Sequence, residues 1–144
     1  YKFIDWYEGV FETIGYLKKI ERSNLFVITN KPTLPCINLL SEANIFNSFK
    51  EVLGIDYKIF IKEKNPSNFE NKTCAFDYFF AKNNLSKNQS VYIGDTLNDK
   101  ISAENCNLKF IGVKYGFHNW DSNDKNITLI DSINELKHTS KLIK

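Results

Sequence analysis

The sequence has little of several residue types, and each shortage excludes a class of protein. The three cysteines, Cys36, Cys74 and Cys106, lie far apart and fit no zinc or redox spacing, so we interpret them as reduced thiols. There is no signal peptide and no run of about 18 apolar residues, the length that a membrane helix needs. The net charge is only +2 and the lysines are scattered, which argues against nucleic acid or a membrane as a partner. A cytoplasmic protein is therefore expected.

Methionine is absent altogether, and the chain begins at Tyr1. We therefore expect a processed or truncated piece of a longer protein. The composition is otherwise typical of a globular protein, because hydrophobic residues make up 42% of the 144 residues and charged residues 25%. This length suits a single domain, residues 1–144, with a sizeable core, and the sequence has no internal repeats.

Helix and strand patterns alternate along the chain. Apolar residues at helical spacing predict helices, and short runs of β-branched and aromatic residues predict strands. The predicted helices span about residues 8–20, 32–43, 72–84, 99–106 and from 132 onward, and the predicted strands are 25–28, 51–53, 91–93, 110–113 and 127–130. Residues 56–71 are rich in lysine and predict a loop, with room for a small excursion at residues 57–61. This alternation predicts an α/β fold, a Rossmann-like parallel sheet in three layers with helices on both faces.

The strongest chemical signal lies between Val91 and Asp99. A short strand is ended by Gly94, Asp95 follows at once, and Asp99 comes four residues later, where a helix is predicted to begin. Open α/β sheets place their ligands at the carboxyl ends of the strands. Two carboxylates there suit Mg²⁺, which binds through one or two carboxylates and otherwise keeps water and phosphate. The alternative is that Gly94 and Asp95 form only a turn and that Asp99 is an N-terminal helix charge.

Two further side chains are expected at the same edge of the sheet. Thr29 ends the strand 25–28, and Lys72 opens a predicted helix. A hydroxyl, an ammonium and a carboxylate-bound Mg²⁺ are the groups needed to hold a phosphoryl group and to neutralise its developing charge. Thr29 could instead be a strand-end cap, and Lys62 and Lys64 are nearby rivals of Lys72.

At this point the sequence resembles the haloacid dehalogenase superfamily, and within it the hydrolases that are similar to phosphoglycolate phosphatase. The second motif of that family is matched by residues 25–32, the third-motif lysine by Lys72, and the fourth motif by residues 94–99. Softer similarities lie at residues 8–10, 52–56 and 111–117. Each motif is weak alone, but their order and spacing together are specific, and the resemblance covers nearly the whole chain.

The resemblance implies a role for each matching residue. Thr29 would hydrogen-bond a phosphoryl oxygen, helped by the backbone N–H of Asn30. Lys72 would stabilise the nucleophile and the transferring phosphoryl group. Asp95 would ligate Mg²⁺, and Asp99 would ligate it or hold its water. The catalytic set implied for this chain is therefore Thr29, Lys72 and Asp95.

The chain departs from the family at two points. The family often has proline after the third-motif lysine, and here Thr73 follows. The first motif, a strand ending in Asp-x-Asp that supplies the nucleophile and the general acid and base, has no match in the sequence. In the family that strand is central, between the strands that end at Thr29 and Asp95, and a cap domain follows it. Its absence would leave two buried strand edges unpaired. Either an upstream fragment of the same protein fills the gap, or the two strands close on each other.

The expected function is Mg²⁺-dependent hydrolysis of a small phosphorylated metabolite through an aspartyl-phosphate whose nucleophile lies upstream of Tyr1. The 144-residue chain alone is expected to be inactive. One alternative is a non-catalytic module of the same fold that binds phosphate and Mg²⁺. Another is a flavodoxin-like or receiver-like domain, since such folds also place acidic residues at strand ends.

Overall fold

Helices alternate with short parallel strands throughout the part of the chain that the computed structural model describes, residues 5–20, 23–116 and 118–138. The strands are β1 (Phe26–Ile28), β2 (Glu51–Leu53), β3 (Val91–Gly94), β4 (Lys109–Val113) and β5 (Thr128–Ile130). The α-helices are α1 (Val10–Lys19), α2 (Thr33–Glu42), α3 (Tyr57–Phe60), α4 (Lys72–Asn83) and α5 (Leu97–Asn105). Short 3₁₀ helices are η1 (Phe46–Ser48), η2 (Lys87–Gln89) and η3 (Ile133–His138). None of the described helices is long and apolar enough to cross a membrane.

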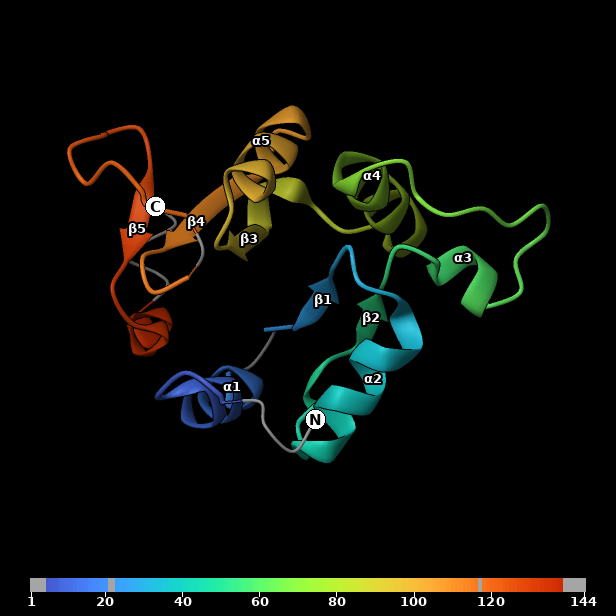
Figure 1. The fold of residues 1–144 in the computed structure, drawn as a ribbon, viewed down its shortest axis with the longest axis horizontal. Coiled ribbons are helices and arrows are strands. Elements are labelled where there is room, and N and C mark those ends of the chain that lie inside the picture. The colour runs from blue at the N-terminus through green and yellow to red at the C-terminus, as the bar shows by residue number, and fades with distance from the viewer. Residues whose placement is uncertain (1–4, 21–22, 117, 139–144) are drawn as a thin grey trace.

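The strands form two separate parallel sheets. β1 pairs with β2, and β3, β4 and β5 form the second sheet in that order. In Figure 1 the strands follow one another from left to right in the order β5, β4, β3, β1, β2. Among the described residues β1 and β3 do not pair, so these two strands have not closed on each other.

Helices cover both faces of the strands, as the sequence predicts. In Figure 1 α4 and α5 lie above the strands, and α1 and α2 lie below them. Side chains alternate between the two faces along β1 and β2, and those on each face pack against the helices that cover it. Ile28 and Leu53 pack with the aromatic residues of α4, whereas Val27 and Val52 pack with residues of α1 and α2. The parallel α/β fold in three layers is therefore confirmed.

One core cluster crosses from one sheet to the other. Phe76 of α4 is 1% exposed and lies edge-on to Tyr92 of β3, with 4.7 Å between the ring centroids. Phe79, one turn further along α4, makes the same kind of contact with Phe26 of β1. Because α4 packs on both β1 and β3, it holds the two sheets side by side.

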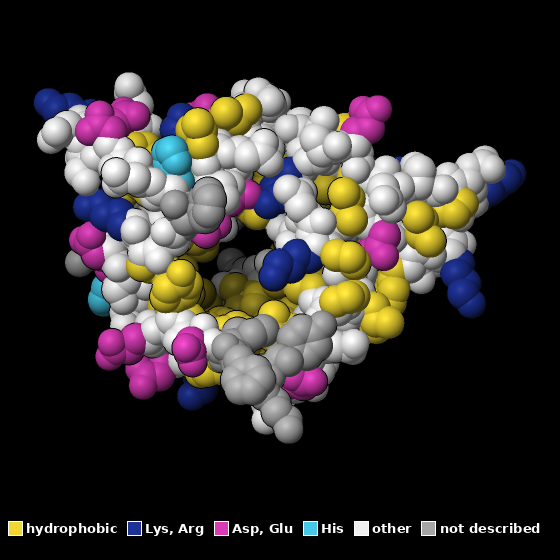
Figure 2. Space-filling view, in the orientation of Figure 1, with side chains coloured by type: hydrophobic (Ala, Val, Ile, Leu, Met, Phe, Trp, Pro, Cys, Tyr) yellow, Lys and Arg dark blue, Asp and Glu magenta, His cyan; other side chains and the backbone are white. Residues whose placement is uncertain are grey.

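A cavity of about 520 Å³ lies between β1 and β3. Its apolar lining comes from β1, β3, α1 and α4, and its polar lining includes Ser86 and Gln89 at the amino end of β3. Figure 2 shows a hollow in this face of the molecule, with hydrophobic side chains on its floor.

Local signals explain most element boundaries. Asn71 caps α4 by accepting from the backbone N–H of Cys74 at 2.9 Å, and Asn84 ends that helix in the left-handed conformation, with φ 51°. Asn107 ends α5 in the same conformation, with φ 56°, as predicted. α5 begins at Leu97, about two residues before its predicted start, because Thr96 is its N-cap.

One sequence prediction about secondary structure was incomplete and another was wrong. The predicted loop 56–71 contains the short helix α3 at the place where a small excursion was expected, and Tyr57 of this helix is buried in the core. The predicted final helix is the 3₁₀ helix η3 over the described residues, although Glu135 does accept from the backbone N–H of Ser132 at 3.0 Å, as its capping spacing predicts. The predicted continuation past His138 lies outside the described residues.

Candidate functional site

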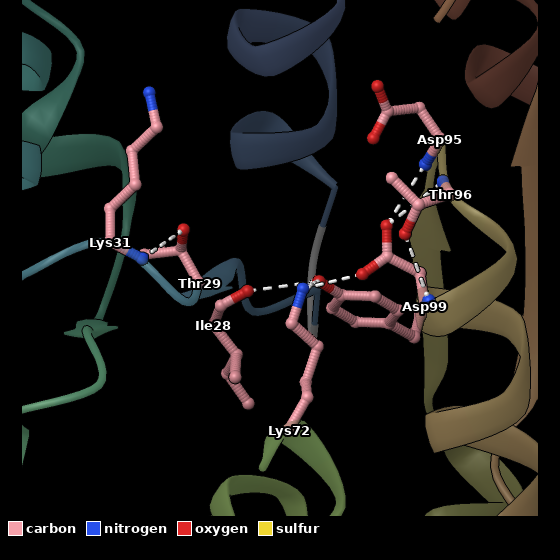
Figure 3. Close-up of polar contacts among 8 residues, drawn as sticks. Ile28, Thr29, Lys31, Lys72, Asp95, Thr96 and Asp99 are labelled. Atoms are coloured by element: carbon pink, nitrogen blue, oxygen red, sulfur yellow. Dashed lines mark hydrogen bonds and ion pairs between the residues drawn. The ribbon is translucent and has the colours of Figure 1, made fainter. Parts of the chain in front are cut away.

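The centre of the candidate site is a buried ion pair between Lys72 and Asp99. Lys72 is the first residue of α4 and Asp99 lies in the first turn of α5, and their Nζ and Oδ1 atoms are 2.5 Å apart. The two residues are only 8% and 5% exposed. A charge buried this deeply needs an opposite charge beside it, and here Lys72 and Asp99 each provide that charge for the other. Figure 3 shows this pair at the carboxyl ends of the strands, where the sequence places it.

The environment of Lys72 favours its charged form. Burial alone would lower its pKa, but electrostatic interactions and hydrogen bonds with Tyr92 and Asp99 outweigh burial and raise the pKa of Lys72. The Lys72 ammonium donates to the Tyr92 hydroxyl at 3.1 Å, and this hydroxyl donates to the backbone carbonyl of Ile28 at 2.9 Å. These contacts thus favour the charged form of Lys72 at the sheet edge.

Asp99 also fixes the turn between β3 and α5. Its Oδ2 atom accepts from the backbone N–H groups of Asp95 and Thr96, each at 3.2 Å, and its own N–H donates to Thr96 Oγ1 at 3.1 Å. This is a capping box, which satisfies the N–H groups at the start of α5. A Cβ on Gly94 would lie 2.6 Å from Asp99 Oδ2, so the close approach of this carboxylate requires glycine there.

Asp95 lies at the tip of the same turn. Figure 3 shows its carboxylate pointing away from that of Asp99. Gly116, in the loop after β4, lies against it, because a Cβ there would come within 2.2 Å of Asp95 Cβ. The backbone N–H of His118 donates to the Asp95 carbonyl at 2.9 Å. The loop after β4 therefore fixes the position of Asp95.

Thr29 lies at the end of β1, on the other side of Lys72 from Asp95 (Figure 3). Its N–H donates to the Leu53 carbonyl at 2.9 Å, and its hydroxyl accepts from the backbone N–H of Lys31 at 3.2 Å. Asn30 is exposed at the same turn. The structure thus places Thr29 and Asn30 at the predicted edge of the sheet. Of the predicted site residues, Lys72 and Asp99 are the two whose side chains bond each other.

A second carboxylate fixes the turn that carries Thr29. Asp56, after β2, accepts from the backbone N–H of Thr33 at 2.8 Å and from its hydroxyl at 2.7 Å. Thr33, fully buried at the start of α2, also accepts from the N–H of Gly54 at 3.0 Å. Burial tends to raise the pKa of Asp56, but these hydrogen bonds outweigh it and lower the pKa.

The rival lysines lie elsewhere. Lys62 and Lys64 are exposed in the loop that follows α3, and Lys62 has a left-handed backbone, with φ 58°. Lys72 is the one of the three that contacts the fourth-motif carboxylate Asp99. The geometry thus supports the choice of Lys72, while its action on phosphate stays a prediction.

The donors at this edge fit Mg²⁺ only in part. The described residues contain no group of three or more His, Cys, Asp or Glu side chains placed to hold a metal. Asp99 Oδ2 already accepts from two backbone N–H groups and Oδ1 accepts from Lys72, so three of the roughly four acceptor positions of Asp99 are used by protein donors. Mg²⁺ is usually bound by only one or two carboxylates, with water and phosphate as its other ligands. Asp95 as a single carboxylate ligand would therefore be enough.

Comparison with known proteins assigns the chain to a family. A profile of haloacid dehalogenase-like hydrolases matches residues 2–113. The chain belongs to this family. It is 28% identical to a phosphoglycolate phosphatase of Pseudomonas fluorescens over 112 residues, which cover 78% of this chain and 38% of that protein. The chain thus spans about two fifths of the length of the curated relatives that it matches.

Solved structures of predicted phosphatases share the fold. A predicted phosphatase from Clostridium acetobutylicum superposes with a TM-score of 0.75 at 26% identity, over 94% of this chain and 59% of that one. A predicted phosphoglycolate phosphatase from Haemophilus somnus gives a TM-score of 0.72 at 25% identity, over 93% of this chain and 56% of that one. The resemblance found in the sequence is confirmed at the level of family and fold.

Sequence reasoning missed three residues that shape this site. Tyr92 was interpreted only as part of a strand, Thr96 only as a position within the fourth motif, and Asp56 only as part of a weak motif. Thr96 could have been found, since a threonine three residues before an acidic residue is a helix-start signal. The contacts of Tyr92 and Asp56 join segments 64 and 23 residues apart, which no local pattern reveals.

Proposed function

We propose that this chain is the larger part of the catalytic core of a Mg²⁺-dependent phosphatase that hydrolyses small phosphate monoesters, similar to phosphoglycolate phosphatase. The observation that carries the proposal is the buried Lys72–Asp99 pair, placed between Thr29 and Asp95 at one edge of the strands. The match to haloacid dehalogenase-like hydrolases supports it. In this proposal the nucleophilic aspartate lies on a strand upstream of Tyr1.

The open edge of β1 supports a place for that strand. Leu25 and Thr29 flank β1; the Leu25 carbonyl accepts from the Lys50 N–H and the Thr29 N–H donates to the Leu53 carbonyl, so both residues direct these backbone groups toward the β2 side. Backbone groups alternate along a strand, so those of Phe26 and Ile28 face β3 across the cavity, where the Ile28 carbonyl accepts from the Tyr92 hydroxyl. Strand edges that pair with no other strand invite a further strand. A parallel strand between β1 and β3 would join the two sheets and bring its carboxyl end between Thr29 and Asp95.

Each site residue then has a defined task. Thr29 and the N–H of Asn30 donate to oxygens of the bound phosphoryl group. Lys72 stabilises the negative charge of the nucleophile and of those oxygens, and Asp99 keeps Lys72 charged and in place. Asp95 would hold Mg²⁺, which when bound supplies a positive charge that neutralises phosphoryl oxygens. Attack by a carboxylate on phosphorus forms a bond to phosphorus and expels the alcohol, and water then hydrolyses the acyl phosphate.

The test compares turnover in two versions of the protein. The first is the 144-residue chain, and the second is a longer version that carries the segment encoded upstream. Phosphoglycolate and p-nitrophenyl phosphate are the substrates, with and without Mg²⁺. We expect turnover only by the longer version with Mg²⁺, and a loss of about 100- to 1,000-fold in Lys72→Met, as is typical when one charge-stabilising donor is removed.

Lys82 provides a matched control. It also lies on α4, where it pairs with Glu51 at 3.2 Å and is more than a third exposed. Lys82→Met should therefore leave turnover within about twofold of the parent, since exposed ion pairs contribute little. Equal losses in both lysine variants, or full turnover by Asp95→Asn, would contradict the proposed roles.

A non-catalytic module that binds phosphate and Mg²⁺ is the second candidate. The specific observation in its favour is that Asp99, the carboxylate in contact with Lys72, serves as counter-charge of Lys72 and as cap of α5, so the described part of the site offers groups that can bind phosphate without using this carboxylate as a nucleophile. A higher melting temperature with Mg²⁺ plus inorganic phosphate, without turnover by the longer version, would decide for this function.

A further inference from the structure

The turn between β1 and α2 carries Thr29, and the loop that follows β2 holds this turn in place. Thr33, the first residue of α2, donates its N–H and its hydroxyl to the same oxygen of Asp56, at 2.8 and 2.7 Å. Because this hydroxyl gives its proton to Asp56, its oxygen can accept from Gly54, whose backbone nitrogen lies 3.0 Å away. Thr33 thus joins the start of α2 to two residues of the loop after β2.

The same contact takes the place of an ordinary helix cap. A helix start is usually capped by the side chain directly before it, but here that residue is Pro32, which makes no such bond. Asp56 supplies the acceptor from 23 residues away. Beside it, the Ile55 N–H donates to the Lys31 carbonyl at 3.0 Å, and a Cβ on Gly54 would lie 2.5 Å from that carbonyl oxygen. The two loops are therefore joined at several points and approach each other closely.

These bonds reach the Thr29 hydroxyl through Lys31. The backbone N–H of Lys31 donates to Thr29 Oγ1 at 3.2 Å. A hydroxyl whose oxygen accepts this bond keeps its own proton for another acceptor, and the direction of that proton depends on where Lys31 lies. Pro32 separates Lys31 from Thr33, and its fixed φ leaves this short segment little freedom. A shift of Thr33 would therefore move Lys31 and, with it, the proton of the Thr29 hydroxyl.

The contacts lie away from the gap between β1 and β3. They join the loops at the carboxyl ends of β1 and β2, and the Thr29 N–H donates to the Leu53 carbonyl on the same side. A further strand placed in the gap, as the proposed function requires, would leave these contacts in place. Thr33 is fully buried, so water does not compete for its bonds. The arrangement is thus compatible with the longer protein.

We propose that Thr33 and Asp56 are positioning residues of the phosphate site, which hold the turn 29–33 so that the Thr29 hydroxyl directs its proton toward the bound phosphoryl group. Donors stabilise developing charge best when they are already in position, because they then need no reorganisation during the reaction. Thr33 and Asp56 act through the turn and do not touch the substrate. This inference rests on the proposed function and deepens it.

The first test needs no turnover. The backbone order of residues 29–31 in the 144-residue chain is measured by ¹⁵N NMR relaxation in the parent, Thr33→Val and Thr33→Ser. Valine keeps the shape of threonine without the hydroxyl, whereas serine keeps the hydroxyl. We expect a clear loss of order in Thr33→Val and nearly parental order in Thr33→Ser. Thr13→Val is the matched control and should leave this turn unchanged, because Thr13 is equally buried and its hydroxyl bonds Asn134 at 3.5 Å, outside the site.

The second test uses the longer version with p-nitrophenyl phosphate. The loss of one oriented donor predicts about a tenfold lower kcat/KM in Thr33→Val, with nearly parental values in Thr33→Ser and Thr13→Val. The same substitution is then made in a Thr29→Val background. If Thr33 acts through the Thr29 hydroxyl, Thr33→Val should lower kcat/KM there by less than about twofold. A merely structural role would give equal losses in both backgrounds and would overturn the inference.

The outcomes separate this inference from the proposed function. Unchanged order of residues 29–31 in Thr33→Val overturns the positioning role, and so does a loss of order with unchanged kcat/KM. If Thr33→Val does not fold, Asp56→Asn takes its place: its amide oxygen still accepts both bonds without the charge, so a smaller loss of order and of kcat/KM is expected. If the longer parent shows no turnover at all, the proposed function fails, and the NMR comparison, repeated with inorganic phosphate, still decides whether Thr33 orders the turn.

Discussion

Removing the charge of Lys72 should destabilise the chain more than removing any exposed lysine charge. Lys72→Met keeps the length of the side chain but leaves the Asp99 carboxylate, 7% exposed, without its counter-charge. Breaking one side of a buried ion pair costs about 3–5 kcal/mol. We expect about 3 kcal/mol here, at the lower end, because Asp99 Oδ2 keeps its bonds from Asp95 and Thr96.

The opposite change should cost more. Asp99→Asn leaves the Lys72 ammonium with the Tyr92 hydroxyl as its other hydrogen-bond acceptor, and it weakens the capping box of α5. A loss of about 4 kcal/mol is expected. The double variant buries neither charge, so its loss should be about 2–3 kcal/mol smaller than the sum of the two single losses, the coupling typical of contacting residues.

Urea unfolding of the 144-residue chain, followed by circular dichroism, measures these differences. The m-value should stay constant, since the surface exposed on unfolding does not change. Lys82→Met serves as the control and should cost less than about 1 kcal/mol, as its pair with Glu51 is exposed. Equal costs for Lys72→Met and Lys82→Met, or strictly additive losses in the double variant, would refute the reasoning that this pair is buried and coupled.

Three further predictions concern the turns around the site. The lowered pKa of Asp56 means that its contribution to stability is present above its ordinary pKa of 3.8 and is lost as pH falls through the lower folded value. Asp56→Asn should therefore reduce the acid dependence of the melting temperature below about pH 4, and an unchanged acid profile would count against it. Gly116→Ala should cost about 1–3 kcal/mol in urea unfolding, because the added carbon would meet Asp95. Gly15→Ala, with no atom within 4 Å of the added carbon, should not destabilise α1, so a matching loss there would remove the steric argument. Thr96→Ala should lower stability by about 1 kcal/mol through the lost cap of α5, and a neutral result would show that the Asp99 bonds suffice.

Much of the architecture could be predicted because its causes are local. A run such as Leu25 to Ile28 has few alternatives to a strand, and Asn84 and Asn107 end helices because asparagine tolerates a left-handed backbone. Parallel pairing follows from the alternation of helices and strands. The placement of Thr29, Lys72, Asp95 and Asp99 at one edge could be predicted as well, since parallel strands end at a common edge of the sheet, while their roles stay predictions.

The tertiary structure decided which partners these side chains bond. The sequence predicted that Asp99 is either a metal ligand or a charge at the start of a helix. In the fold its Oδ1 accepts from Lys72, and its Oδ2 accepts from the backbone of the turn between β3 and α5. Tyr92 became part of the site only because α4 and β1 were brought against β3. Local pattern fixes which elements form, because it acts over a few residues along the chain. Contacts across 20 to 64 residues depend on how whole elements pack, so only the folded structure shows them.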